Sequence, residues 1–205
     1  MLPPIRMYRH DSIMTNRPYG MDLDADGWMW EGCGRNRHNA HRLGSGEIRD
    51  LEIPEMDDGV VYQVFVWQDR LIMTLGESSH YLVYDPTTGR AQKMEIPGTR
   101  PIVWYGVKTG DDRVLLYDRA VSAVLALDAP DARPRAVPCP YVGQLASGWW
   151  SVGDGYVYSP LYEPARLIRF DPVRARFIDE IHAPFPEASL AGVYEHEGVL
   201  YLWDT

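Results

Sequence analysis

Cysteine is scarce in this sequence, and basic residues are outnumbered by acidic ones. The 205 residues include 2 cysteines, 20 lysines and arginines, and 29 aspartates and glutamates, giving a formal net charge of -9 at pH 7. Cys33 and Cys139 lie in different repeats at unrelated positions, so we interpret them as free thiols rather than a disulfide framework or a zinc site. An acidic chain without a basic run lacks the charges that neutralise phosphates. We therefore expect it to bind neither nucleic acid nor a membrane surface.

Long apolar runs and helical periodicity are also missing. Residues 1–15 contain no apolar stretch of the length that a signal peptide or membrane anchor needs. This predicts a cytoplasmic protein if the N-terminus is native. No segment repeats apolar residues with helical spacing over three turns. The GxGxxG, P-loop, GxSxG and HExxH motifs are absent, so nucleotide-binding, serine-hydrolase and zincin functions have no support.

What the sequence does contain is an internal repeat. Five turn residues recur at intervals of 43, 43, 42 and 43 positions: Gly27, Arg70, Arg113, Gly155 and Gly198. Each follows an acidic residue, in the order Asp26, Asp69, Asp112, Asp154 and Glu197. Short β-type runs flank these turns, for example Val64–Trp67 and Leu71–Met73. Each repeat is therefore predicted to centre on a β-hairpin.

Two further landmarks recur in step with the hairpin. Asp-Pro or Asp-Ala-Pro turns follow a third β-type run at Asp85, Asp128 and Asp171, and we interpret these aspartates as turn makers rather than ligands. A last run ends in an apolar residue and proline, as at Ile53-Pro54 and Ile96-Pro97. Proline cannot donate to a strand ladder, so these pairs mark where a strand stops.

Four short strands in about 43 residues are typical of a propeller blade. We predict an all-β protein, a single β-propeller domain of four-stranded antiparallel blades over residues 1–205. The blades are expected to start near residues 19, 62, 104, 148 and 191, with the fifth incomplete. Residues 1–16 include a candidate ring-closing strand. A compact five-bladed ring and part of a larger six- or seven-bladed propeller both fit the pattern. An open ring would favour self-association through exposed blade edges.

The first unit carries a family resemblance. Residues 17–54 contain Pro18-x-Gly20, Asp26-Gly27-Trp28-Met29-Trp30, Glu31, Asn36 and Ile53-Pro54, and the second unit keeps the Asp-Pro-x-Thr-Gly turn at 85–89. These motifs resemble the repeats of virginiamycin B (streptogramin) lyase-like and NHL-type propellers. The resemblance implies a propeller, and in the lyases a histidine with neighbouring glutamates and magnesium. The corresponding Glu-x-His pairing is not found in this sequence.

The repeat register places one acidic residue per blade at one end of the predicted channel. These residues are Glu31, Glu77, Asp118 and Glu163. Converging carboxylates predict a site for a divalent cation, Ca²⁺ or Mg²⁺, and the alternative is a solvated acidic rim. Candidate ligand-binding residues lie beside or between them: Arg35, Asn36, His38, His80, Trp104, Arg119, Trp149 and Tyr162. Ser78 and His80, with Glu77 as the carboxylate, are also a candidate nucleophilic pair, although their spacing alone fixes no geometry.

Two functions follow from these observations. The first is a binding module for a small molecule or a protein on the loop face of the propeller, since no complete catalytic constellation can be assembled. The second is a metal-assisted lyase or hydrolase of the streptogramin-lyase or lactonase-like kind, which the resemblance and the acidic loops favour. The catalytic residues of that second function are unknown from sequence.

Overall fold

The fold is known from a computed structural model. It describes residues 20–32, 37–56, 60–76, 78–96, 104–118, 123–141, 148–161, 164–183, 185–187 and 190–204. Within these ranges the regular structure is β-strand, apart from one 3-10 turn, η1 (Pro54–Met56). The predicted all-β class of four-stranded antiparallel blades is confirmed. The described part of the chain contains no helix long and apolar enough to cross a membrane.

Four sheets have four strands each, ordered as they follow in the sequence, and a fifth has two. The first holds β1 (Gly20–Leu23), β2 (Trp28–Gly32), β3 (Arg37–Arg42) and β4 (Ile48–Glu52). The second holds β5 (Val61–Trp67), β6 (Arg70–Leu75), β7 (His80–Asp85) and β8 (Arg90–Glu95). The third holds β9 (Trp104–Lys108), β10 (Val114–Asp118), β11 (Ala123–Ala126) and β12 (Arg135–Pro138). The fourth holds β13 (Trp150–Ser151), β14 (Val157–Leu161), β15 (Arg166–Asp171) and β16 (Arg176–His182). The fifth holds β17 (Leu190–His196) and β18 (Val199–Asp204).

The hairpin predicted for the second unit forms as expected. Val64 pairs with Met73 and Val66 with Leu71 in antiparallel register. Gln68 and Asp69, the two loop residues, have φ angles of 49° and 59°. Positive φ at both central residues is the geometry of a type I′ turn, whose twist matches that of the flanking strands. The fifth sheet has a second two-residue loop, between the paired residues His196 and Val199. The corresponding loops are longer in the other three sheets, where the closing pairs are Leu23 with Met29, Lys108 with Val114, and Ser151 with Val157.

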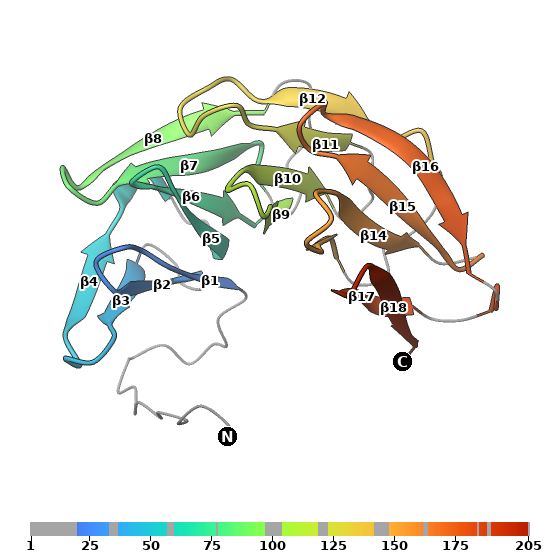
Figure 1. The fold of residues 1–205 in the computed structure, drawn as a ribbon. Coiled ribbons are helices and arrows are strands. Elements are labelled where there is room, and N and C mark those ends of the chain that lie inside the picture. Colours follow the sequence, from blue (N-terminus) through green and yellow to red (C-terminus); the bar gives the residue numbers. More distant parts are fainter. Residues whose placement is uncertain are drawn as a thin grey trace.

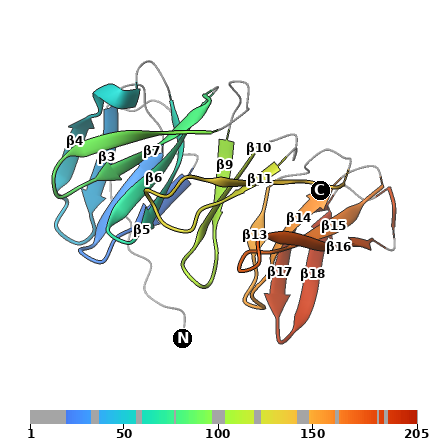
Figure 2. The same ribbon diagram turned by 90° about the horizontal axis from the view of Figure 1, so that it is seen from above.

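The sheets stand side by side around an arc. In Figure 1 the first strand of each unit lies on the inner side of the arc and the fourth strand on the outer side. The sheet β1–β4 and the hairpin β17–β18 lie at opposite ends of the arc, which Figure 2 shows from above. The predicted ring-closing strand in residues 1–16 lies outside the described residues and stays a prediction.

Four hydrophobic clusters hold neighbouring sheets together. Trp28 and Trp30 of the first sheet pack with Leu71 and Leu82 of the second. Ile72 and Val83 pack on Val114 and Leu125 of the third sheet. Val124 and Leu115 then pack with Val157 and Phe170 of the fourth. Tyr158 and Leu167 meet Val193 of the fifth, in the smallest cluster. Because side chains alternate between the two faces of a strand, each inner sheet buries one face on each neighbour.

Candidate functional site

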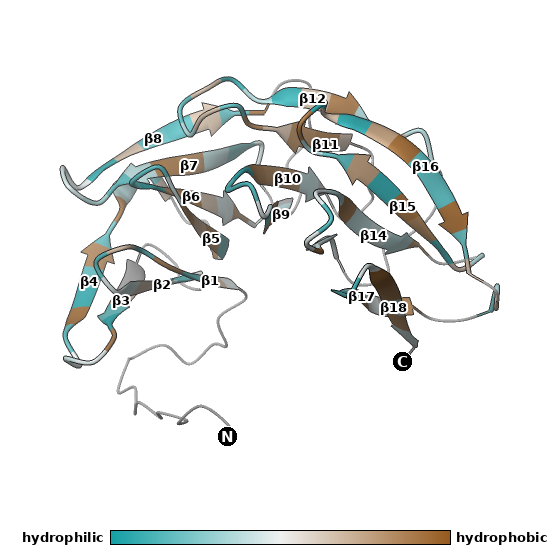
Figure 3. Cartoon of the chain, viewed as in Figure 1, coloured by the Kyte–Doolittle hydropathy of each residue, from teal (hydrophilic) through white to brown (hydrophobic). Residues whose placement is uncertain are grey.

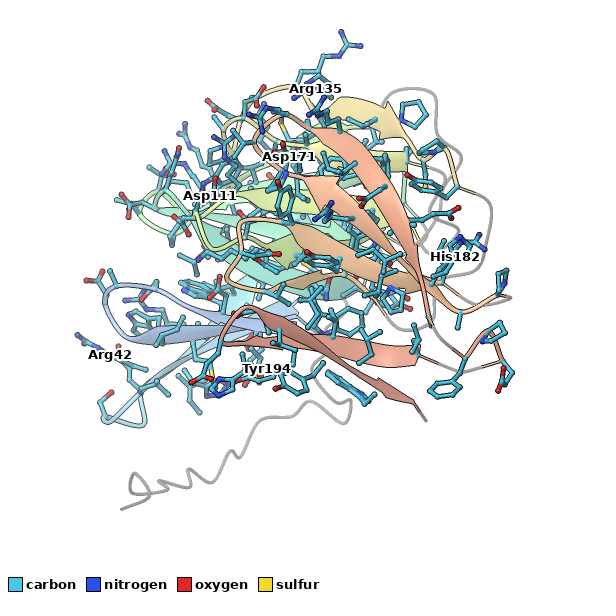
Figure 4. All side chains as sticks on the ribbon, turned by 45° about the vertical axis from the view of Figure 1, so that its right-hand side comes forward. Arg42, Asp111, Arg135, Asp171, His182 and Tyr194 are labelled. Carbon is cyan, nitrogen blue, oxygen red and sulfur yellow. The ribbon has the colours of Figure 1, made fainter. Side chains whose placement is uncertain are left out.

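Among the described residues, a pocket of about 630 Å³ lies where four hairpin turns meet. At this end of the molecule the first strand of each unit turns into the second, and the third turns into the fourth. We call this end the hairpin face and the opposite end the loop face. The pocket is lined by Leu23, Asp24, Ala25, Asp26, Val66, Gln68, Asp69, Arg70, Leu71, Pro86, Thr87, Lys108 and Asp112. These residues come from the first three units. In Figure 4 the labelled Asp111 and Asp171 lie at the hairpin face and His182 at the other end.

Asp24 builds the first wall of this pocket. Its Oδ1 accepts hydrogen bonds from the amides of Asp26 (3.0 Å) and Trp28 (2.8 Å), and its Oδ2 accepts from the buried indole Nε1 of Trp30 at 2.8 Å. Gly27 follows with φ of 81°, a conformation that glycine adopts without strain. The carboxylate of Asp24 therefore shapes the turn.

Lys108 joins the first unit to the third across the pocket. Its Nζ lies 3.2 Å from Oδ2 of Asp22 and 3.1 Å from Oδ1 of Asp112. The same Oδ2 of Asp22 accepts a 2.8 Å hydrogen bond from the amide of Val66. Burial alone would lower the pKa of Lys108, but the hydrogen bonds and charges of Asp112 and Asp22 outweigh it and the pKa is raised. Lys108 and Asp22 together thus link three sheets.

The charge left over in the pocket is negative. Lys108 is offset by its two aspartates, and Arg70 lies 3.4 Å from Oδ2 of Asp85. Asp26 and Asp69 are exposed and form no ion pair with any residue in the described ranges. Their negative fields add in a concave site, which concentrates cations there. The sequence pointed to Asp26 and Asp69 only as turn residues.

Most of the loop face predicted from sequence falls outside the described residues. This holds for Arg35, Asn36, Glu77, Arg119, Tyr162 and Glu163. His38, Trp104 and Asp118 lie on β3, β9 and β10, and for these three residues the structure describes the backbone alone. Within the described residues no three His, Cys, Asp or Glu side chains are grouped as a metal site would require. The predicted cation site at the loop face therefore stays a prediction.

Glu31, one of the four predicted carboxylates, is buried on β2 with 6% of its surface exposed. Its Oε1 lies 3.7 Å from Nε2 of His41 on the neighbouring strand β3. Sequence spacing did not predict this pair, because strand pairing and not a fixed local motif brings the two residues together. The register of the β2–β3 hairpin could have indicated this pair. Met29 is opposite His41, and Glu31 lies two residues further along β2 on the same side as Met29.

His80 and Trp149 are the other two predicted residues whose side chains are described. The hydroxyl of Ser78 lies 2.8 Å from Nδ1 of His80 and accepts the amide of His80 at 3.2 Å, so the pair forms a local turn with a largely buried hydroxyl. Trp149 is 5% exposed and packs edge-on against Phe170 and Phe177. Its surroundings are those of a core residue. Cys139, predicted to be a free thiol, forms no disulfide, and its sulfur lies 3.6 Å from the carbonyl oxygen of Tyr141. Cys33 lies outside the described residues.

Comparisons with known proteins agree on the fold. No protein-family model matches the chain, and no curated protein matches it by sequence. Virginiamycin B lyase from Staphylococcus aureus superposes with a TM-score of 0.71 at 15% identity, over 91% of this chain and 63% of that one. A catalytically inactive histidine-to-alanine variant of that lyase, with quinupristin, gives a TM-score of 0.70 at 16% identity, over 93% and 65%. Kuenenia stuttgartiensis hydrazine synthase gives 0.63 at 10% identity, over 92% and 55%.

The chain has a virginiamycin lyase-like fold, as its repeats predicted. It spans just under two thirds of the length of the two lyase chains. Identities this low establish the fold alone, because one fold hosts many activities.

Proposed function

We propose that the chain is a propeller that binds a small molecule, and that the molecule carries an amine or guanidine group. The observation that carries the proposal is the pocket of about 630 Å³ on the hairpin face. Its carboxylates Asp26 and Asp69 form no ion pair within the described part of the chain, whereas its cations Arg70 and Lys108 are paired there with other aspartates. This volume is in the range of small-molecule sites. Leu23 and Val66 supply an apolar wall beside the carboxylates. The site differs from the loop face expected from sequence, which remains a second place for binding.

Titration calorimetry with benzamidine and spermidine tests the proposal, with benzoate as the anionic counterpart of benzamidine. We expect the cations to bind, more weakly as salt rises, and benzoate not to bind. The double variant Asp26→Asn, Asp69→Asn should lower the affinity at least several-fold, since it removes two charges without changing size. Glu187→Gln, an exposed acid on the segment between the fourth and fifth sheets, is the matched control and should have no effect. Equal binding of benzamidine and benzoate would refute the proposal.

A lyase activity is the second candidate, and a specific observation favours it. The similar lyase loses its activity when a histidine is replaced by alanine, and this chain holds a half-buried histidine, His41, 3.7 Å from a carboxylate oxygen of Glu31. A general base of this kind is what proton abstraction needs. Conversion of quinupristin, followed by liquid chromatography, tests it: turnover that His41→Ala abolishes would establish the lyase. No turnover, or turnover that His41→Ala leaves unchanged, would refute this second candidate.

A further inference from the structure

The pocket on the hairpin face offers uncharged hydrogen-bonding groups as well as carboxylates. Gln68 and Thr87 line it, and both residues are exposed. Within the described ranges, neither the amide group of Gln68 nor the hydroxyl of Thr87 forms a hydrogen bond. An amide group and a hydroxyl can each donate and accept. A ligand in this pocket therefore meets neutral donors and acceptors beside the negative charge.

Lys108 supplies a further donor. An ammonium group has three N–H bonds, and Asp22 and Asp112 accept at 3.2 and 3.1 Å from its Nζ. Among the residues that the structure describes, no third acceptor lies at this ammonium group. A ligand oxygen can take that place. A carboxylate there would be repelled by Asp26 and Asp69, so an uncharged oxygen such as a hydroxyl fits the pocket better.

The turns around the pocket hold polar side chains in an unfavourable backbone conformation. Five non-glycine residues of the described ranges have positive φ angles, and three of them line this pocket: Gln68, Asp69 and Asp112, at 49°, 59° and 60°. The corresponding turn of the fifth sheet has a glycine, Gly198, at its second position. Strained residues of this kind gather at ligand sites. Their place here supports a role for the side chains of Gln68 and Asp69 in binding.

The apolar part of the pocket is aliphatic. Leu23, Val66 and Leu71 supply it, and none of the described residues that line the pocket is aromatic. Figure 3 shows the hydrophobic residues along β6, which begins beside the pocket, and the hydrophilic turn between β9 and β10, which contains Asp112. A flat ligand would find no ring on which to stack. The lining thus favours a ligand with a saturated body.

We propose that the ligand is a saturated amine that also carries hydroxyl groups, an amino alcohol or an amino sugar. Its ammonium group is held by Asp26 and Asp69, and its hydroxyl groups meet Gln68, Thr87 and Lys108. The inference rests on the proposed function, because it specifies the rest of the cation that this pocket takes. A simple polyamine satisfies the carboxylates alone, since its protonated nitrogens offer Lys108 no acceptor.

Titration calorimetry with glucosamine, cyclohexylamine and glucose tests the proposal. Glucosamine has the charge and the hydroxyl groups, cyclohexylamine has the charge on a saturated ring, and glucose has the hydroxyl groups alone. At about pH 6 both amines are protonated. One hydrogen bond changes an affinity by about 3- to 10-fold. Glucosamine should therefore bind at least several-fold more tightly than cyclohexylamine, and glucose should not bind measurably.

Gln68→Leu and Thr87→Val remove the neutral groups and keep the carboxylates. Each should lower the affinity for glucosamine by about 3- to 10-fold and so reduce its advantage over cyclohexylamine. Gln92→Leu is the matched control, because Gln92 is exposed on β8 and does not line the pocket. This variant should bind glucosamine like the parent chain. The melting temperature verifies that each variant folds.

The outcomes separate this inference from the proposed function. Cyclohexylamine that binds as tightly as glucosamine overturns the inference and leaves the proposed function standing. The same holds if both Gln68→Leu and Thr87→Val keep the full preference for glucosamine. If neither amine binds, or if glucose binds as tightly as glucosamine, the carboxylates select no cation and the proposed function itself is wrong.

Discussion

Asp171 is a carboxylate with 3% of its surface exposed, held at the start of the turn between β15 and β16. Its Oδ1 accepts the amide of Arg174 at 2.9 Å, and its Oδ2 lies 2.8 Å from the guanidinium of the same residue. Asp85 has the corresponding place in the second unit, where it accepts the amides of Thr87 and Thr88. Both aspartates thus act as the turn makers that the sequence indicated.

The bonds to Arg174 predict a pH effect on stability. Burial would raise the pKa of Asp171, but these bonds outweigh it and the pKa lies below its ordinary value of 3.8. A lowered pKa in the folded state means that the contribution to stability is complete above 3.8 and is lost as the pH falls below it. Asp171→Asn should therefore lower the free energy of unfolding at pH 7 by about 1–3 kcal/mol. The loss should shrink toward pH 3.

Urea unfolding at the two pH values measures this difference. Asp179→Asn is the control, since Asp179 pairs with Arg169 at a half-exposed position, where an ion pair contributes about 1 kcal/mol or less. A loss for Asp171→Asn that is the same at pH 3 and pH 7 would show that the ionised carboxylate contributes nothing beyond its shape.

At the scale of single elements, the hairpin of the second sheet carries a local strain. Gln68 and Asp69 both have positive φ angles, although neither is glycine. The fifth sheet has the same two-residue loop with Glu197 and Gly198, at φ angles of 50° and 77°. A non-glycine residue in the left-handed region costs about 1–2 kcal/mol, less for asparagine.

The substitution Gln68→Asn, Asp69→Gly should accordingly raise the free energy of unfolding by about 1 kcal/mol, because Asn-Gly is the preferred pair for this turn. Thermal and urea unfolding measure the gain. Glu197→Asn in the fifth sheet, where the glycine is already present, should give a smaller one. A destabilised double variant would mean that the side chains of Gln68 and Asp69 hold the pocket wall through contacts that outweigh the strain.

The strands were predictable from sequence because their signals are local. Acidic turn residues, Asp-Pro turns and alternating apolar residues recur within each unit, and the paired strands around Gln68 and Asp69 match them. The site was not predictable in the same way. The pocket depends on contacts between units, such as Lys108 with Asp22, which are 86 positions apart. Glu31 and His41 meet because of strand register, and no spacing rule identifies such a pair.

Viewed as a whole, the molecule is a row of sheets in which each contacts its neighbours. Stability in such an array is a sum of sheet and interface contributions. The cluster between the first two sheets contains Leu71 and Leu82, at 1% and 0% exposure, among many buried side chains. The cluster that holds the fifth sheet is far smaller, and β18 has one strand neighbour among the described residues. Stability should therefore decline toward β17–β18.

Native-state hydrogen exchange on the monomeric chain tests this gradient. Amides of β17–β18 should open at a lower free energy than those of β6 and β7. Val193→Ala, which removes a 2% exposed side chain from the last interface, should reduce protection in β17–β18 and leave β6 and β7 nearly unchanged. Leu82→Ala should lower the protection of its own and the adjoining sheet by about 2–5 kcal/mol, the cost of a cavity in a packed core. If Val193→Ala instead lowers protection equally in all sheets, the arc unfolds as one cooperative unit, and the small last interface is as essential to it as the large first one.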